Sequence, residues 1–332
     1  MALALGSGGA RGYAHIGAIE VLDERGFELV SIAGASMGAL VGGLRAAGRL
    51  AGYTEWARGL TQLDLVRLLD PSLSAPGAIR AEKVFARVRE LLDGALIEDL
   101  DIPFTAVATD LLAGKEVWFQ RGPVATAIRA SIAIPTIITP VMLNGRLLAD
   151  GGLMNPVPVS PTVSVSSDVT IAISVSGDSA AHDGAPAGET AEERPAEEWM
   201  GRFRRGASRL MDREMVRTLV GKLGNGAEAV ADGAQPTPAP VEDEFGALPH
   251  GLSKLDVMSQ SLDAMQRVLT RYRLAGYPPD LLVNVPRDAC RSLEFHRAAE
   301  LIEIGRTLTT EALDRAGIVP TTAAGRADEA VS

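Results

Sequence analysis

The chain has 332 residues, of which 46% are hydrophobic and 4% are aromatic, so it can bury one large and mainly aliphatic core. Its net charge of −10 excludes the broad positive field of a general nucleic-acid-binding protein. Its single cysteine, Cys290, excludes an intrachain disulfide, and no apolar run reaches the roughly 18–20 residues that cross a bilayer. We therefore expect a cytoplasmic protein, with peripheral contact at the inner membrane surface left open.

The first part of the sequence alternates between short apolar runs and helical patterns. Residues 2–5 predict a buried strand, and residues 14–24 predict a helix that ends at Gly26. Residues 29–33 predict a second strand, followed by a helix at 37–47 that is rich in small residues. This order of elements is typical of a parallel sheet with right-handed crossovers.

Further elements are expected along the rest of the chain. Helices are predicted at 54–69, 81–92, 126–131, 252–273 and 298–316, and strands at 104–109, 116–120, 146–149, 169–175 and 281–285. Loops are predicted at 71–77, 180–198 and 224–240, and residues 321–332 are expected to be a frayed tail.

Residues 199–223 combine apolar positions at roughly helical spacing with six arginines. This pattern fits a basic amphipathic helix on anionic lipid, a lid, or a helix packed on the core. Acidic neighbours dilute the positive charge, which favours the packed helix.

The segment Gly34-Ala35-Ser36-Met37-Gly38 has the G-x-S-x-G spacing of a nucleophile elbow. Such a match arises easily by chance. Here, however, Ser36 follows a predicted strand and precedes a predicted helix, whose N-terminal end favours negative charge. The context therefore indicates a nucleophilic serine.

The glycine-rich segment Gly6-Ser7-Gly8-Gly9-Ala10-Arg11-Gly12 directly follows the first predicted strand. A dinucleotide site is disfavoured, because Ser7 replaces the first glycine of the fingerprint and the next strand does not end in an acid. The segment also lacks the Gly-Lys-Ser/Thr that a P-loop requires. An oxyanion hole made of backbone N–H groups remains, with a tight turn that binds nothing as the alternative.

The base for Ser36 is open, because Asp150-Gly151-Gly152 alone could be an ordinary turn. The histidines are His15, His182, His250 and His296. We expect His15 in packing and the next two in loops, whereas His296 could complete a Ser36–Asp150–His296 triad. Ser36 comes very early for an α/β-hydrolase, so a serine paired directly with an aspartate fits better.

Together these segments resemble the patatin-like phospholipase family. The glycine-rich opening with His15 and Gly17, the elbow, and Asp150-Gly151-Gly152 followed by Asn155-Pro156 match its motifs in order. Thr109-Asp110-Leu111, and Arg129-Ala130-Ser131 with Ile134-Pro135, resemble bacterial members. Ser7 stands where the family usually has glycine, which keeps the backbone N–H but reduces the freedom of the backbone to adopt positive φ.

The resemblance implies a three-layer α/β/α fold with a mainly parallel sheet. The resemblance covers roughly residues 1–175, which we expect to form the catalytic core. Composition and periodicity predict mobile loops and the amphipathic helix at 176–250, elements that complete the fold at 251–320, and a tail at 321–332. For Asp110 and Arg129, turn contacts or an ion pair are expected rather than a catalytic role.

The resemblance also implies a serine lipid acyl hydrolase that acts on a fatty-acyl ester or phospholipid without metal or cofactor. Ser36 would be the nucleophile and Asp150 the general base, with a pKa raised by desolvation. The oxyanion hole would comprise Gly8, Gly9, Ala10 and Arg11, supported by Gly6, Gly12, Gly34, Gly38, Gly151 and Gly152. Two rivals stay open, namely the triad esterase and a non-catalytic lipid- or protein-binding module on the same scaffold.

Overall fold

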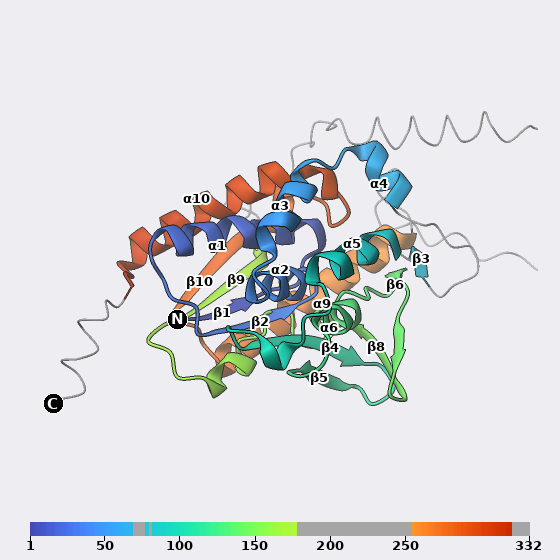
Figure 1. The fold of residues 1–332 in the computed structure, drawn as a ribbon, viewed down its shortest axis with the longest axis horizontal. Coiled ribbons are helices and arrows are strands. Elements are labelled where there is room, and N and C mark those ends of the chain that lie inside the picture. The colour runs from blue at the N-terminus through green and yellow to red at the C-terminus, as the bar shows by residue number, and fades with distance from the viewer. Residues whose placement is uncertain (69–76, 80–81, 178–253, 321–332) are drawn as a thin grey trace, which may run out of the picture. The chain divides into compact units, whose positions relative to one another are not determined.

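Apolar runs of the sequence assemble into a central β-sheet. The computed structural model describes residues 1–68, 77–79, 82–177 and 254–320, which are drawn in colour in Figure 1. Eight described strands form one sheet in the order β10-β9-β1-β2-β4-β8-β7, with β5 paired to β4. Their bounds are β1 Ala2–Leu5, β2 Ser31–Ala35, β4 Phe104–Asp110, β5 Lys115–Phe119, β7 Val141–Leu143, β8 Arg146–Asp150, β9 Thr170–Gly177 and β10 Leu281–Pro286. Two short strands, β3 (Gly77–Ile79) and β6 (Thr136–Ile138), pair with each other.

The sheet is mainly parallel. β10, β9, β1, β2 and β4 pair in parallel, whereas β5, β8 and β7 are antiparallel additions beside β4. β1, β2 and β4 are buried along their whole length, as expected for parallel strands covered on both faces.

Helices and loops cover both faces of this sheet. The helices are α1 Ala14–Glu24, α2 Met37–Ala46, α3 Leu50–Arg58, α4 Gln62–Leu68, α5 Glu82–Leu92, α6 Val124–Ser131, α9 Lys254–Gly276 and α10 Ala298–Ala316. Side chains of a strand alternate between the two faces. On β1, Leu3 and Leu5 join the large core with α1, α2 and α10, whereas Ala4 packs with Val157 and with Leu274 of α9. The expected three-layer α/β/α architecture is therefore confirmed.

The helices nearest the two ends of the described chain, α1 and α10, pack side by side (Figure 1). Their backbones touch at two glycines: a Cβ on Gly17 would overlap with the Ile302 carbonyl, and a Cβ on Gly305 would overlap with the Ala14 carbonyl. All described residues belong to one unit that combines an N-terminal and a C-terminal stretch of chain.

Several elements differ from the sequence-based expectation. β2 begins at Ser31 rather than Leu29, because the ladder starts where Ser31 pairs with Ala2 of β1. The helix expected at 54–69 is two helices, α3 and α4. Gly59 ends α3, and a capping box begins α4, in which the Asp64 amide donates to Thr61 Oγ1 and the Thr61 amide donates to Asp64 Oδ2. The strands β3, β6 and β7 were not expected.

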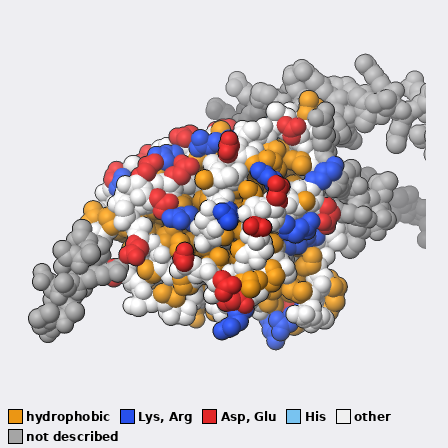
Figure 2. Space-filling view, viewed as in Figure 1, with side chains coloured by type: hydrophobic (Ala, Val, Ile, Leu, Met, Phe, Trp, Pro, Cys, Tyr) orange, Lys and Arg blue, Asp and Glu red, His pale blue; other side chains and the backbone are white. Residues whose placement is uncertain are grey.

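Some expectations lie outside the described residues. These are most of the loop at 71–77, the loops at 180–198 and 224–240, the amphipathic segment 199–223, the tail 321–332, His182 and His250. Among the described helices, none is both long and apolar enough to cross a membrane. On the face seen in Figure 2, acidic, basic and apolar side chains are interspersed.

Candidate active site

Strand pairing places the two predicted catalytic residues next to each other. β2 ends with Ala35 opposite Val107 of β4, and β8 ends with Asp150 opposite Ala108, the next residue of β4. Both strands lie on the same edge of β4, because β5 occupies the other edge along Ala106–Asp110. The C-terminal ends of β2 and β8 therefore meet head to head, which brings Ser36 beside Asp150.

Ser36 has the strained backbone expected of a nucleophile elbow. Its φ of 55° and ψ of −123° lie in a region that side chains rarely adopt, and the residue is only 2% exposed. Its amide donates to Ser131 Oγ at 2.9 Å, and Ser131 Oγ donates to the Val107 carbonyl at 2.6 Å. The tight packing of Gly38 against the Leu5 carbonyl leaves no room for a side chain there. These contacts hold the turn in its strained form.

Asp150 is a buried carboxyl group with one firm hydrogen bond. Oδ1 accepts the Gly152 amide at 2.7 Å, and Thr109 Oγ1 donates to the Asp150 carbonyl at 2.9 Å. Burial raises the pKa of Asp150 to about 6, as expected, although the Ser36 hydroxyl, the Gly152 amide and the Ser7 hydroxyl act in the opposite direction. The hydroxyl contacts fall short of full hydrogen-bond geometry, so Oδ2 is a buried acceptor without such a bond to any described residue.

The glycine-rich turn lies against the loop after β10. The Ala10 amide donates to the Ser292 carbonyl at 2.9 Å, whereas the Gly8 and Gly9 amides have no acceptor among the described residues. Gly9 has a φ of +57°, and a Cβ there would overlap with the Ser292 carbonyl. Two of the expected oxyanion donors, Gly8 and Gly9, are thus free of protein partners in the described structure.

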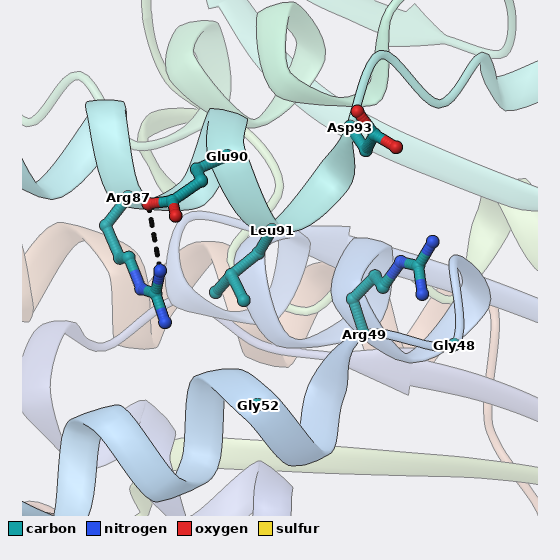
Figure 3. A pocket seen from close by; sticks show the side chains of 7 residues that line it. All are labelled: Gly48, Arg49, Gly52, Arg87, Glu90, Leu91 and Asp93. Carbon is teal, nitrogen blue, oxygen red and sulfur yellow. Dashed lines mark ion pairs between the residues drawn. The ribbon is translucent and has the colours of Figure 1, made fainter.

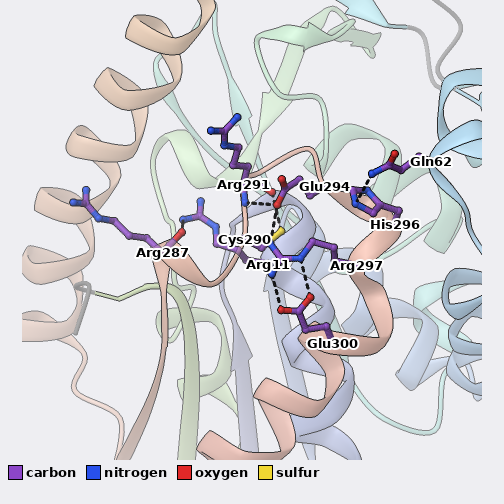
Figure 4. Close-up of polar contacts among 9 residues, drawn as sticks. All are labelled: Arg11, Gln62, Arg287, Cys290, Arg291, Glu294, His296, Arg297 and Glu300. Carbon is purple, nitrogen blue, oxygen red and sulfur yellow. Dashed lines mark hydrogen bonds and ion pairs between the residues drawn. The ribbon is translucent and has the colours of Figure 1, made fainter. Parts of the chain in front are cut away.

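The side chain of Arg11 contacts the C-terminal part of the chain. The guanidinium donates to the carbonyls of Gly8 and Arg287 and to Ser292 Oγ, each at 3.3 Å. It also lies 3.9 Å from Asp263 of α9. Figure 4 shows Arg11 between Arg287 and Cys290. This side chain joins the turn to the loop after β10 and to α9.

The two described histidines have other partners than Ser36. Burial lowers the pKa of His15 to about 4, so the neutral ring donates from Nε2 to the Gly6 carbonyl at 2.8 Å and holds the turn. His296 Nε2 lies 3.2 Å from Gln62 Nε2 on α4, as Figure 4 shows. The structure therefore brings Asp150, and not His296, to Ser36.

An apolar hollow opens beside Ser36 and Gly9. Its wall includes Tyr13, Leu40, Tyr53, Trp56, Leu65, Phe85, Ile132, Ile134, Ile138, Leu293 and Phe295. The Tyr13 ring stacks near Tyr53 and meets Phe295 edge to face. A hollow with one polar end and an aliphatic and aromatic wall suits a ligand with a hydrocarbon chain.

A second hollow lies between the start of α3 and the end of α5 (Figure 3). It is lined by Arg49, Arg87, Glu90 and Asp93, and Arg87 pairs with Glu90 at 2.8 Å. Neither Ser36 nor Asp150 lines it, so it is separate from the predicted site.

Asp110 and Arg129 make local contacts. Asp110 Oδ1 accepts the amides of Leu112 and Ala113 in the turn after β4. Arg129 donates to the Thr139 carbonyl and lies over the Phe85 ring at 4.6 Å. Asp110 Oδ2 also pairs with Arg146 Nε at 4.0 Å. The structure therefore contains turn contacts and an ion pair at Asp110, and a carbonyl and a ring contact at Arg129.

Two residues of the site carry roles that sequence reasoning did not assign. Ser131 supports the elbow, and Ser7 contacts the Asp150 carboxylate. Ser131 lies in the resembling segment 129–131, but its partners on β2 and β4 follow only from strand pairing. The Ser7 hydroxyl could have been suspected because it interrupts a run of glycines beside the expected oxyanion hole.

Comparisons of the sequence and of the fold with known proteins identify several similar proteins. A family model described as patatin-like phospholipase matches residues 3–163. An uncharacterized NTE family protein of Mycobacterium tuberculosis is 50% identical over 333 residues, covering 95% of this chain and 91% of the relative. Patatin-like phospholipase domain-containing protein 6 of Mus musculus is 32% identical over 182 residues, covering 53% of this chain and 13% of the relative. The solved structure of VipD from Legionella pneumophila matches with a TM-score of 0.48 and 15% identity, over 95% of this chain and 66% of that one.

Proposed function

Because this chain belongs to the patatin-like phospholipase family, we propose that it is a serine lipid acyl hydrolase with Ser36 as nucleophile and Asp150 as general base. The family supports a lipid hydrolase in general and lipids as substrates. The observation that carries the finer proposal is the meeting of β2 and β8, which sets a strained serine beside a buried carboxyl group whose pKa is about 6.

The reaction begins with attack of Ser36 Oγ on the ester carbonyl carbon. The hydroxyl proton passes to Asp150, whose Oδ2 has a free lone pair. The Gly8 and Gly9 amides hold the oxyanion of the tetrahedral intermediate; one such donor is typically worth about 2.7–4 kcal/mol. The leaving alcohol takes the proton from Asp150. A water molecule then gives a proton to Asp150 while its oxygen attacks the acyl carbon. The bond from that carbon to Ser36 Oγ breaks, Ser36 takes the proton back from Asp150, and the carboxylic acid leaves.

The acyl chain of the ester occupies the apolar hollow. Ser36 lines the hollow together with aliphatic and aromatic side chains, so a carbonyl carbon at Ser36 leaves its hydrocarbon chain among them. Removal of this chain from water contributes about 0.8 kcal/mol per buried CH₂ group, which favours long esters until the hollow is full.

Hydrolysis of p-nitrophenyl esters of graded chain length tests the proposal, with wild type compared with Ser36→Ala, Asp150→Asn and His296→Ala. We expect the first two variants to lose activity and His296→Ala to keep it. Loss in all three would favour the Ser36–Asp150–His296 triad. A folded wild type that hydrolyses neither these esters nor phospholipid vesicles would favour the non-catalytic binding module.

A further inference from the structure

Ser7 occupies a fixed position beside the carboxylate of Asp150. Its amide donates to the Pro156 carbonyl at 2.7 Å, and the preceding Gly6 amide donates to the Ile173 carbonyl at 2.9 Å. Among the described residues other than glycine, positive φ occurs at Ser36, Asp93 and Asn144. Ser7 therefore fits the turn without backbone strain.

The side chain of Ser7 lies against Gly152. A Cβ placed on Gly152 would overlap with both Cβ and Oγ of Ser7, and it would lie 2.8 Å from Gln266 Nε2 of α9. Ser7 Oγ thus packs directly on the residue whose amide donates to Asp150 Oδ1 at 2.7 Å. Ser7 is buried, so its hydroxyl meets the carboxylate in a site with little water.

From this geometry we infer that Ser7 is a positioning residue for Asp150: its hydroxyl lies against Gly152, beside the ionised carboxylate, and stabilises that charge so that Asp150 can accept the proton of Ser36. This inference rests on the proposed function. The Ser7 hydroxyl stabilises the charged form and works against burial, which raises the pKa of the same carboxyl group. Ser7 therefore extends the activity of the base to lower pH.

The role is distinct from that of the nucleophile. When Ser36 Oγ bonds to the ester carbon, its proton moves to Asp150, and the carboxyl group becomes neutral. A hydroxyl donates more strongly to a carboxylate than to a neutral acid. Ser7 thus favours the ionised resting state, so its removal should lower the fraction of Asp150 that can act as a base at acidic pH and should change the reaction little at alkaline pH.

The test is the pH dependence of kcat/KM for a p-nitrophenyl ester with wild type, Ser7→Ala and Ser7→Gly. We expect the acidic limb of both variants to move upward by about one pH unit, as loss of a hydroxyl that stabilises a buried carboxylate predicts. At pH 5.5 kcat/KM should fall roughly 3- to 10-fold, whereas the plateau near pH 8 should stay within about twofold.

Ser174→Ala is the matched control, because Ser174 is equally buried on β9 and its Oγ lies 3.5 Å from Ser176 Oγ. Its acidic limb should coincide with that of wild type. An acidic limb that is unchanged in both Ser7 variants would overturn the inference, as would an equal loss of kcat/KM at every pH.

Failure of the proposed function has a different signature. In that case Ser36→Ala would retain wild-type activity, or wild type would have none. The pH dependence of the unfolding midpoint then tests the role of Ser7 without a measurement of activity. In Ser7→Ala, the pH range over which ionisation of Asp150 destabilises the fold should lie at higher pH than in wild type. Coincident curves of unfolding midpoint against pH would overturn the positioning role.

Discussion

At Asp150, burial acts on the stability of the fold as well as on the proposed chemistry. The pKa in the folded state is about 6, above the ordinary aspartate value of 3.8, so the folded protein binds the proton more tightly than the unfolded chain. This group therefore stabilises the fold fully only below about pH 4, and that contribution is lost as the pH rises through 6. A site suited to proton transfer near neutral pH thus costs stability at neutral pH.

Asp150→Asn should be more stable than wild type at pH 8. Asparagine keeps an oxygen that can accept the Gly152 amide but carries no charge. The expected gain is on the order of 2–3 kcal/mol, from a shift of about two pKa units. Urea unfolding at pH 8 and at pH 4 measures it. The difference in unfolding free energy between Asp150→Asn and wild type should be smaller at pH 4. An equal difference at both pH values would contradict the explanation that the buried charge of Asp150 causes it.

Arg11 acts through the loop that it holds. Its guanidinium is 4% exposed and donates to two carbonyls and one hydroxyl, so removal leaves buried acceptors without partners. Arg11→Met should lower the free energy of unfolding by about 2–4 kcal/mol and should reduce kcat/KM by loosening the glycine-rich turn.

The control for Arg11 is Arg25→Ala. Arg25 pairs with Asp314 at the surface, so Arg25→Ala should lower the free energy of unfolding by at most about 1 kcal/mol. The free energy of unfolding in denaturant and the rate of ester hydrolysis are measured for both variants. If Arg11→Met were as stable and active as Arg25→Ala, the loop would not depend on the guanidinium.

At the scale of elements, local patterns predicted the parallel core well. The helices at 14–24 and 298–316 and the strand at 2–5 have the bounds expected from periodicity. The hairpin of β7 and β8 was missed, although Asn144-Gly145 at its turn, both at positive φ, is a strong hairpin signal. The capping box at Thr61 and Asp64 likewise marked the start of α4 in the sequence.

The site was predicted as a set of motifs rather than as a geometry. Ser36 and Asp150 were identified from their flanking glycines and from family resemblance. Their proximity depends on β4, which pairs with β2 and β8 on one edge and with β5 on the other. Pairing between distant segments has no local signature, so the contacts of Ser131 and of Ala10 with Ser292 could not be predicted.

The contact between α1 and α10 gives a prediction about packing. Gly305→Ala places a Cβ against the Ala14 carbonyl, and two backbones cannot separate without moving whole helices. We expect a loss of unfolding free energy of about 1–3 kcal/mol or more, as for overpacked cores.

Gly276→Ala is the matched control. Gly276 ends α9 and has open space around it, so alanine there should be neutral or stabilising by about 0.4–1 kcal/mol. Thermal and urea unfolding measure both variants. Equal stability of the two would mean that the helices can move apart freely.

Across the whole molecule, the sheet is completed by strands from both ends of the described chain. β10 pairs with β9, and α10 covers α1, although both follow residue 280. A fragment of residues 1–177 would therefore expose the edge of β9 and the buried face of α1. We expect this fragment to be insoluble or unfolded and inactive, as measured by circular dichroism, gel filtration and ester hydrolysis. A soluble, active fragment would show that the core is complete without β10 and α10.

The glycine contact between the first and last helices also has a consequence for how the protein is made. Gly17 and Gly305 are about 290 positions apart, so a ribosome that adds 5–20 residues per second separates their synthesis by roughly 15–60 s. During that interval α1 has no α10 to cover it. The nascent chain therefore carries an uncovered apolar helix during that time, and this contact can close only after residues 298–316 have been synthesised.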